Sequence, residues 1–527
     1  MRAIAAYYHS LRYQSRRQIL ARLRHELAWR LYPRPRPDAE WNPPGQSLLE
    51  RFQLHYFDSA PGSERAALER RIENWIASNP PGSFPGWHPY PTSLRIVNWI
   101  RALGPQMPVR ASDSLASQAA FLERHLEYHL GGNHLLENAR ALLAAGLYFD
   151  GPAAARWTTK ALELLRRELS HQVLPDGGHF ERSPYYHVLM TRLVSDVVDL
   201  LDARGNAVPP EIASAAHRMT VFARALRHQD GGLPCFHDGL AGDRAEPSAA
   251  DLPRSFPDSG YYILEGPQGR LIADYGAPGS HPNPGHQHAG IFSLEISAGG
   301  RRVIVDSGTE TYDPGPRRDR LRSTAAHNTV SVDGRDQFEL WGAFRVGRRA
   351  WVSAVRERRE ARFEAISSAH NGYARLAVEH RRTIVSLAGA GWLIVDDVAG
   401  RGSHRLESFL HLGPGITPVI DRDRVCLLPL GWILLPFGAT QPPEALDDVC
   451  SPTLGRIEPS RTLRLESSGD LPRRFGYFLG PLASARLAFD GADRFRIEAP
   501  PLAIALRIEK NVFDSLEVEY NDSSDAT

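Results

Sequence analysis

The sequence predicts an α+β protein of several domains, in which an all-α region precedes antiparallel β-sheets stacked as a β-sandwich. Three observations predict this fold class. A chain of 527 residues exceeds what one hydrophobic core normally serves, so we expect at least two cores. Apolar residues recur every three or four positions between residues 64 and 228, which is the helical period. After residue 257 the period changes to two, which is the period of strands.

The first forty residues predict a basic amphipathic helix followed by a proline-rich linker. Leu20, Leu23, Leu27 and Leu31 recur at helical spacing, and five arginines crowd the same stretch. Successive prolines in YPRPRPDAEWNPPG then end the helix. We expect this helix to pack on the body of the protein with a charged outer face. The alternative is an arm that docks on a partner or makes peripheral contact with a membrane.

The region from residue 41 to residue 250 predicts an all-α domain. Seven segments carry the helical period, at residues 64–78, 93–103, 118–130, 135–149, 154–169, 188–203 and 210–228. The connections GGNH (131–134) and LPDGGHFERSPYYH (174–187) carry several polar and aromatic side chains. Loops of this kind often carry binding and catalytic residues, so we expect a ring of helices to present them.

The remainder, residues 251–527, predicts short antiparallel strands separated by Gly, Asp, Asn or Pro. The expected strands are 261–266, 269–276, 291–297, 301–308, 328–334, 381–387, 391–398 and 425–438. The sequence therefore divides into three parts: residues 1–40, residues 41–250 and residues 251–527. The boundary between the helical and the sheet domain lies near residue 250.

Composition argues against several classes of function. The chain has 62 basic and 61 acidic residues, so its net charge of +1 gives no global electrostatic case for nucleic-acid binding. Cys235, Cys426 and Cys450 are widely spaced, which indicates neither a disulfide framework nor a thiolate zinc site. The sequence has no stretch apolar enough to span a bilayer and no apolar region typical of a secretory signal. We expect a cytoplasmic protein, with the periplasm as the alternative.

Two loops of the helical region collect residues suited to chemistry. GGNHLLEN places Asn133, His134 and Glu137 where positions three and four apart share one helix face. The same residues also fit an ordinary helix start with Asn133 as N-cap. The second loop is more polar and aromatic than an ordinary helix connection, and it carries Asp176, His179, Glu181, Tyr185, Tyr186 and His187. Its tyrosines can also be packing residues whose tips reach solvent.

Two histidines one residue apart stand at the start of an expected strand, in PGHQHAGIFSLEIS (284–297). An extended backbone would send His286 and His288 to the same side. Asp306 and His327 follow in the next two predicted strand regions. Two histidines and one carboxylate are a common zinc set with an open fourth position, although this spacing is looser than that of a local metal motif.

Several segments together resemble the heparinase II/III superfamily of polysaccharide lyases. They occur in the family's order between about residue 40 and residue 415, and they are WHPYPTSLRIVNWI, GGNHLLENARAL, DGGHFERSPYYHVLM, GHQHAGIFSLEI with VIVDSGT, and RSTAAHNTVSVDG. The resemblance implies an N-terminal incomplete (α/α) toroid followed by C-terminal antiparallel β-sheets. It also implies action on uronate-containing polymers, such as heparan-type glycosaminoglycans and alginate.

The family's chemistry assigns roles to the clustered residues. β-Elimination removes the proton α to the uronate carboxylate, which is barely acidic until the carboxylate's charge is neutralised. The resemblance gives that neutralisation to Asn133 and His134. It makes Tyr186 the base and acid, which requires nearby positive charge to lower a tyrosine pKa of about 10. His286 is the base where the uronate has the opposite stereochemistry, and Tyr312 matches a second catalytic tyrosine of some alginate-type members.

The resemblance further implies a structural zinc ion held by His288, Asp306 and His327, so that the two neighbouring imidazoles have separate tasks. The remaining polar side chains of the two loops are expected to bind substrate, and they are Glu137, Glu181, Tyr185 and His187. The chain departs from the family in having Asn133-His134 where many members have two asparagines, and in carrying a second tyrosine beside Tyr186.

We therefore expect a polysaccharide lyase that cleaves an acidic, uronate-containing polysaccharide by β-elimination. One alternative is a glycoside hydrolase on the same scaffold, with Glu137 paired with Glu181 or Asp176. Another is a noncatalytic glycan-binding or processing factor in exopolysaccharide or capsule synthesis, which the missing secretory signal favours.

Overall fold

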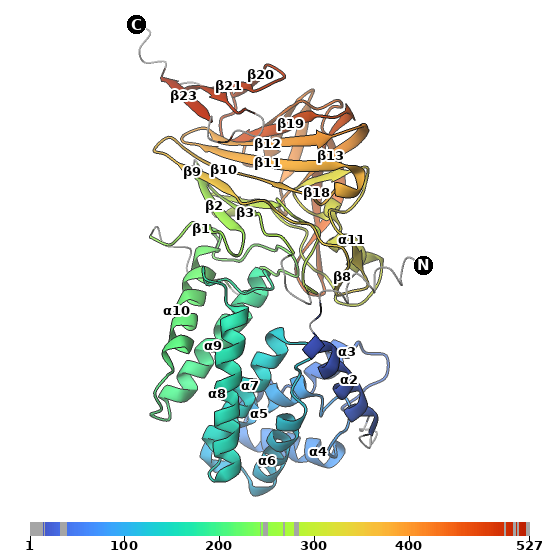
Figure 1. The fold of residues 1–527 in the computed structure, drawn as a ribbon, viewed down its shortest axis with the longest axis vertical. Helices are drawn as coiled ribbons and strands as arrows, with labels where there is room; N and C mark the ends of the chain where they lie inside the picture. The colour runs from blue at the N-terminus through green and yellow to red at the C-terminus, as the bar shows by residue number, and fades with distance from the viewer. Residues whose placement is uncertain are drawn as a thin grey trace. The chain divides into compact units, whose positions relative to one another are not determined.

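The computed structural model describes residues 14, 16–31, 39–242, 244–245, 251–266, 269–278, 284–499, 502–509, 513 and 516–522. These residues form two compact units, and Figure 1 colours the helices before residue 226 from blue to green and the strands after residue 254 from light green to red. The helical unit comprises Gln14–Leu174 and Leu189–Met219, and the sheet unit comprises Pro175–Val188 and the residues from Thr220 onward. A helical unit and a unit of antiparallel sheets confirm the predicted fold class. The sheet unit includes residues 220–242 as well as residues after the predicted boundary near residue 250.

The helices between residue 65 and residue 225 are amphipathic, as their apolar spacing predicts. Their bounds are α2 (Arg16–Leu31), α3 (Leu48–Gln53), α4 (Arg65–Ser78), α5 (Pro89–Leu103), α6 (Val109–Arg124), α7 (Gly132–Tyr148), α8 (Pro152–Gln172), α9 (Pro184–Asp202) and α10 (Pro210–Ala225). All seven segments predicted between residues 64 and 228 are helical. The main difference is that α6 ends at Arg124 instead of residue 130, because the buried Glu127 beyond it binds Asn138 of α7.

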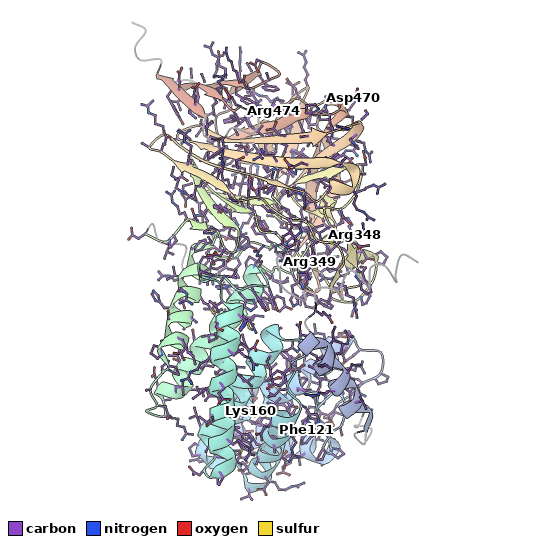
Figure 2. The ribbon with its side chains drawn as sticks, in the orientation of Figure 1. Phe121, Lys160, Arg348, Arg349, Asp470 and Arg474 are labelled. Atoms are coloured by element: carbon purple, nitrogen blue, oxygen red, sulfur yellow. The ribbon has the colours of Figure 1, made fainter. Side chains whose placement is uncertain are left out.

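Helix α7 lies at the centre of the helical unit. Its residues from Leu135 to Ala145 are buried, which fits a helix that is apolar on nearly every face. The surrounding helices α5, α6, α8, α9 and α10 contribute their apolar faces to the same core. Lys160 of α8, labelled in Figure 2, donates a hydrogen bond of 2.9 Å to the Glu123 carbonyl and so links α8 to α6.

The sheet unit is built from antiparallel sheets. A five-stranded sheet has the order β1 (Ser255–Phe256), β2 (Tyr261–Gly266), β3 (Gly269–Asp274), β4 (Leu294–Ala298) and β5 (Arg301–Ile304). An eight-stranded sheet has the order β14 (Thr417–Asp421), β15 (Arg424–Leu428), β16 (Trp432–Phe437), β19 (Arg473–Gly480), β12 (Gly391–Gly400), β11 (Val378–Leu387), β10 (Phe363–His370) and β9 (Arg356–Arg359).

Three smaller sheets and one helix complete this unit. Two are four-stranded, with the orders β17 (Glu444–Thr453), β18 (Arg456–Asp470), β13 (Ser403–His411), β6 (Val330–Val332) and β20 (Arg486–Phe489), β21 (Arg494–Ala499), β22 (Leu502–Arg507), β23 (Glu517–Asp522). The third pairs β7 (Leu340–Trp341) with β8 (Arg345–Val346). Helix α11 (Pro316–Arg322) stands among these strands, and the period of the sequence did not predict it.

Two strand predictions differ from the structure. The segment 425–438, expected as one strand, is the hairpin of β15 and β16, because Pro429 and Gly431 interrupt the pairing between them. The strand expected at 291–297 begins only at Leu294. His286 and His288 therefore lie in a loop before β4, and the alternation of a strand does not orient them.

The core of the sheet unit contains buried ion pairs as well as apolar residues. Trp392, Tyr477 and Leu465 belong to its largest apolar cluster, which joins strands of four sheets. Arg474 of β19, labelled in Figure 2, binds both carboxylate oxygens of Asp397 at 2.7 and 2.8 Å. Among the described helices, none combines the length and apolar character needed to cross a bilayer.

Candidate active site

Tyr186 lies in the first turn of α9, and the residues before it fix its position. Pro184 opens the helix, as its restricted backbone favours at a first helical position. The Ser183 hydroxyl accepts the backbone N–H of Tyr186 at 3.3 Å and donates to the Asp238 carbonyl at 2.9 Å. The sequence Ser-Pro-Tyr-Tyr therefore caps a helix and ties its start to the loop that carries Asp238.

Tyr186 contacts two other predicted catalytic residues within the sheet unit. Its ring stacks on the His286 imidazole with centroids 3.8 Å apart and planes inclined by 27°. Its hydroxyl donates to the Tyr312 hydroxyl at 3.1 Å. Tyr186 is 9% exposed and Tyr312 is half-buried, so the pair of phenols lies largely out of water. The structure thus brings together a phenol and an imidazole that are 100 residues apart in sequence.

Asp238 contacts two histidines, an arginine and a threonine of this cluster. No motif in the sequence predicted it as a site residue. Its two oxygens lie 2.9 Å from His286 Nδ1 and 2.9 Å from His288 Nε2. Arg318 donates to both oxygens, one through Nη2 at 2.7 Å and the other through Nη1. The Thr309 hydroxyl donates at 3.2 Å. Asp238, His288 and Thr309 are fully buried, so this is a desolvated network.

Helix α11 supplies the counter-charge for Asp238. Arg318 is 1% exposed, and its Nε donates to the Ala343 carbonyl at 3.0 Å. The two forked contacts with Asp238 use the planar geometry of a guanidinium. Asp238 is followed by glycine in the segment LPCFHDG, a loop with no periodic pattern. In the sequence, Asp238 is recognisable only as a charged residue in a loop bounded by Pro and Gly. This pattern does not identify the residues that Asp238 binds.

The ionisation of Asp238 determines which ring nitrogens of His286 and His288 carry hydrogen. Burial would raise the pKa of Asp238, but Arg318 and the two histidines outweigh it and hold that pKa well below its usual range. An ionised carboxylate only accepts hydrogen bonds. His286 therefore carries its hydrogen on Nδ1 and His288 carries one on Nε2. In neutral His286 the lone pair lies on Nε2.

Tyr186 and Tyr312 are held in the phenol form. Burial, followed by the neighbouring Tyr312 and Asp238, raises the pKa of Tyr186 well above its ordinary value. Burial also raises the pKa of Tyr312. The role of base predicted for Tyr186 requires the opposite shift. The positive charge nearest to it in this network, on Arg318, is bound to Asp238.

The predicted substrate-binding residues of the second loop have different surroundings. Glu181 is buried, with Oε2 3.8 Å from His286 Nε2. Tyr185 is half-buried, and its ring contacts Tyr186 edge-on at 5.8 Å. His187 is 2% exposed, and its Nδ1 accepts the backbone N–H of His179 at 3.1 Å. Glu181 and Tyr185 thus lie beside the Tyr186 cluster, whereas His187 holds the loop together.

Asn133 and His134 lie in the helical unit, in the first turn of α7. Gly131, not Asn133, is the N-cap, and it has a positive φ of 65° that suits glycine. The Asn133 side chain is 8% exposed and makes no hydrogen bond within the described part of the chain. Its amide is therefore available to a ligand that enters this turn.

His134 is fixed by Glu127, which the sequence analysis also missed. The His134 Nδ1 lies 3.0 Å from the buried carboxylate of Glu127. Burial opposes ionisation of Glu127, but His134, His88 and Asn138 lower its pKa to about 2. Because the carboxylate is ionised and only accepts, His134 carries its hydrogen on Nδ1. The ring of Tyr90 packs against His134 with centroids 4.5 Å apart.

Two carboxylates considered for hydrolysis are held by other groups. Arg140 donates to Glu137 at 2.9 Å through Nε and also binds Asp196. Asp176 accepts hydrogen bonds from the Ser259 backbone at 2.7 Å and hydroxyl at 2.8 Å. Glu137 therefore belongs to a salt bridge, and Asp176 fixes the loop that carries Tyr186. Neither contact favours an acid or base role.

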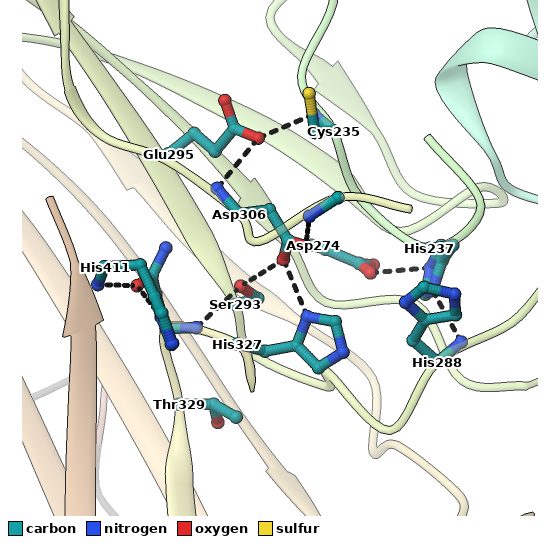
Figure 3. A network of polar contacts seen from close by, with 12 residues as sticks. Cys235, His237, Asp274, His288, Ser293, Glu295, Asp306, His327, Thr329 and His411 are labelled. Atoms are coloured by element: carbon teal, nitrogen blue, oxygen red, sulfur yellow. Dashed lines mark hydrogen bonds and ion pairs between the residues drawn. The ribbon is translucent and has the colours of Figure 1, made fainter. Parts of the chain in front are cut away.

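The structure gives no support to the predicted zinc site. Within the described residues, no group of three His, Cys, Asp or Glu side chains is placed to hold a metal ion. Figure 3 shows Asp306 directed at His327, with Oδ2 2.7 Å from Nδ1, while Oδ1 accepts the Gly308 N–H. Of the three predicted ligands, His288 and His327 each have one buried ring nitrogen without a hydrogen-bond partner, Nδ1 and Nε2 respectively, whereas both oxygens of Asp306 are bound within the chain. Two nitrogens do not make the predicted three-ligand set.

Comparison with known proteins identifies relatives of the chain. The model of the heparinase II/III N-terminus matches residues 106–261, and the model of the heparinase II/III-like C-terminal region matches residues 250–488. A heparin-sulfate lyase of Bacteroides stercoris is 24% identical over 317 residues, which span 53% of this chain and 46% of that protein. FtsZ-localized protein C of Caulobacter vibrioides (strain NA1000 / CB15N) is 28% identical over 425 residues, spanning 72% of this chain and 73% of that protein.

Solved structures show the same fold at low sequence identity. The heparinase III BT4657 gene product superposes with a TM-score of 0.69 at 17% identity, covering 92% of this chain and 86% of that chain. The two family models overlap at residues 250–261 and together extend from residue 106 to residue 488. This chain belongs to the heparinase II/III superfamily.

Proposed function

We propose that the chain is a polysaccharide lyase that cleaves a uronate-containing polysaccharide by β-elimination. The observation that carries this proposal is the stacked pair of Tyr186 and His286, with His286 oriented by the buried Asp238. An acid and a base in contact with each other suit a reaction that removes one proton and delivers another. Membership of the superfamily and a relative named heparin-sulfate lyase support the same activity.

His286 is the proposed base. With its hydrogen on Nδ1 bound to Asp238, neutral His286 has the lone pair of Nε2 to accept the proton α to the uronate carboxylate. Its side chain is 18% exposed, so the imidazole remains accessible. Asp238 stabilises the imidazolium that forms, and the Arg318–Asp238 pair keeps the carboxylate ionised throughout.

Tyr186 is the proposed acid. Burial keeps the phenol protonated, so it can donate its proton to the glycosidic oxygen as the bond between that oxygen and the β carbon breaks. The electrons of the lost C–H bond form the new double bond, and the leaving oxygen becomes a hydroxyl. Tyr312 accepts a hydrogen bond from the same hydroxyl and is the proposed route for returning a proton to Tyr186.

Asn133 and His134 are the proposed groups that neutralise the uronate carboxylate. An amide without a hydrogen-bond partner can donate to a carboxylate oxygen. An imidazolium at His134 would be paired with the ionised Glu127 through Nδ1, and it would donate from Nε2 and supply positive charge. Both contacts grow stronger as negative charge spreads from the α carbon into the carboxylate.

The test is a panel of uronate polymers, including alginate, glucuronan and heparan-type chains, with product formation followed by ultraviolet absorbance. Elimination creates a conjugated unsaturated uronate that absorbs, whereas hydrolysis does not. We expect at least one polymer to give this signal with the wild type. Tyr186→Phe and His286→Ala should abolish it, whereas Tyr185→Phe should keep most of it. New reducing ends without absorbance would overturn the proposal in favour of a hydrolase.

A noncatalytic role is the second candidate function. FtsZ-localized protein C, the relative with 28% identity, is named for where it localises and not for a reaction. If this role holds, wild type and Tyr186→Phe would bind a polymer of the panel equally in affinity electrophoresis, and neither would generate absorbance. The lyase proposal instead expects equal binding with turnover by the wild type alone.

A further inference from the structure

Helix α2 carries an apolar stripe that the described part of the chain leaves exposed. Its exposed large apolar side chains are Ile19 (38%), Leu20 (55%), Leu23 (56%) and Leu27 (57%). With about 100° of rotation per residue, these four fall within about 100° of the helix circumference. The structure therefore differs from the expectation that this face packs on the body of the protein. The other exposed large apolar side chains among the described residues include single ones, such as Val109, and neighbours in sequence, such as Leu48 with Leu49 and Val419 with Ile420.

Positive charge is concentrated around this stripe. Residues 1–36 contain nine arginines and one glutamate, a charge of +8, so the rest of the chain carries −7 within the total of +1. On the helical wheel Arg22 lies on one side of the stripe and Arg24 on the other. The basic segment, residues 1–36, thus combines an apolar helix face with flanking guanidinium groups. The rest of the chain has a net negative charge.

We propose that α2 docks on an anionic lipid surface. The four apolar side chains would enter the boundary between headgroups and acyl chains. Arginine stems are long enough to run along this apolar face while the guanidinium groups stay at the level of the lipid phosphates, to which they donate in pairs. A protein groove would need acidic residues matched to each arginine, whereas an anionic bilayer offers negative charge at every position along the helix. This charge match favours lipid as the occupant.

The test uses the full chain and sedimentation with two kinds of vesicle, phosphatidylcholine alone and an equimolar mixture with phosphatidylglycerol. We expect about tenfold or greater preference for the mixed vesicles at low salt, because arginines near an anionic surface add their attraction. Raising the ionic strength to about 1 M should remove most of this preference, because the Debye length falls to about 3 Å. Equal sedimentation with both vesicles, or none with either, would overturn the proposal.

Two variants assign the binding to α2. The triple variant Leu20→Ser, Leu23→Ser, Leu27→Ser should reduce the bound fraction on mixed vesicles about tenfold. Its matched control, Val109→Ser, Val419→Ser, Leu428→Ser, changes side chains that are 78%, 47% and 44% exposed outside α2 and should bind as the wild type does. Because all of these positions are exposed, circular dichroism and the melting temperature should not change. Wild-type binding by the α2 variant would contradict the proposal.

The charge is tested separately. Arg22→Gln with Arg24→Gln should lower binding to mixed vesicles and weaken its salt dependence. Arg456→Gln with Arg496→Gln is the control, because those side chains are 67% and 66% exposed in other elements. If the wild type ignores vesicles but the leucine variant changes the molar mass in light scattering, the stripe is a protein interface and the lipid proposal fails.

Discussion

At the scale of single residues, one carboxylate determines the hydrogen positions of the site. Asp238 is buried and ionised, so it accepts from His286, His288 and Arg318 and donates to none of them. This selects the His286 tautomer whose lone pair lies on Nε2. Asp238, His288 and Arg318 are fully buried and His286 is partly exposed, so the buried groups depend on one another for their hydrogen bonds. Asp238 is therefore a positioning residue as important to the proposed reaction as the residues predicted from motifs.

The variant Asp238→Asn tests this role. The amide is isosteric but can donate, so it permits the tautomer of His286 whose lone pair lies on Nδ1, and it removes the charge that stabilises an imidazolium. We expect kcat to fall by about 10²-fold or more with KM little changed. The control Thr309→Val removes a 3.2 Å contact to Asp238 without changing its charge and should cost less than about tenfold. Rates are compared at a temperature where unfolding curves show both variants folded. An unchanged kcat for Asp238→Asn would contradict the role.

At the scale of secondary-structure elements, a cross-strand ion pair connects β11 to β12. Arg382 and Asp396 are directly opposite each other in the two strands. The Arg382 guanidinium donates to both carboxylate oxygens of Asp396, at 2.7 and 2.8 Å. His380 adds a contact of 2.7 Å to the same carboxylate. All three side chains are fully buried. Burial alone would raise the pKa of Asp396, but Arg382 and His380 lower it to about 2.

Asp396→Asn should destabilise the protein by about 3–5 kcal/mol, because Arg382 remains buried without its counter-charge. The matched control is Asp447→Asn, which breaks the cross-strand pair of Asp447 with Arg461. The Asp447 side chain is 92% exposed. That change should cost less than about 1 kcal/mol. Urea unfolding measures both. Equal losses would show that burial does not set the strength of these pairs.

The same pair gives a pH dependence. The pKa of Asp396 is about 2 in the folded chain, against 3.8 for an ordinary aspartate. The folded state therefore binds this proton less readily, and the stabilisation is fully present above about pH 4 and is lost as the pH falls towards 2. The decline of the unfolding free energy across this window should be shallower in Asp396→Asn.

The elements also show what the sequence could and could not predict. Helical periodicity predicted all seven segments between residues 64 and 228, because apolar spacing is local information. The hairpin at 425–438 was missed because its apolar run continues through Pro429 and Gly431. Asp238 was missed because its partners His286 and Arg318 are 48 and 80 residues away, and no local spacing encodes such contacts. Motif resemblance supplied the candidate residues but not the carboxylates that orient them.

At the scale of the whole molecule, the chain passes between its two units more than once. Pro175–Val188 leaves the helical unit, supplies Tyr186 to the sheet unit, and is followed by Leu189–Met219 of the helical unit. The sheet unit then resumes at Thr220, whereas periodicity places the start of the sheet domain near residue 250, and that boundary stays a prediction. The sequence pattern of residues 220–250 predicts a helix end followed by a polar loop. Such a pattern gives no indication that these residues pack against strands. Phe236, for example, is buried and stacks with Tyr261 of β2 at 5.9 Å.

Two fragments distinguish these boundaries. The fragment 251–527 lacks both Phe236 and Asp238, so it exposes apolar surface of β2 and leaves Arg318 and His288 without their carboxylate. A buried charge that loses its partner is strongly destabilising, at about 3–5 kcal/mol. The fragment 220–527 retains both residues. We expect 220–527 to remain in the soluble fraction and to show the more cooperative unfolding by circular dichroism, and 251–527 to precipitate or to melt at a markedly lower temperature. Equal solubility and equal melting would mean that residues 220–250 contribute nothing to the sheet unit, contrary to the contacts of Phe236 and Asp238.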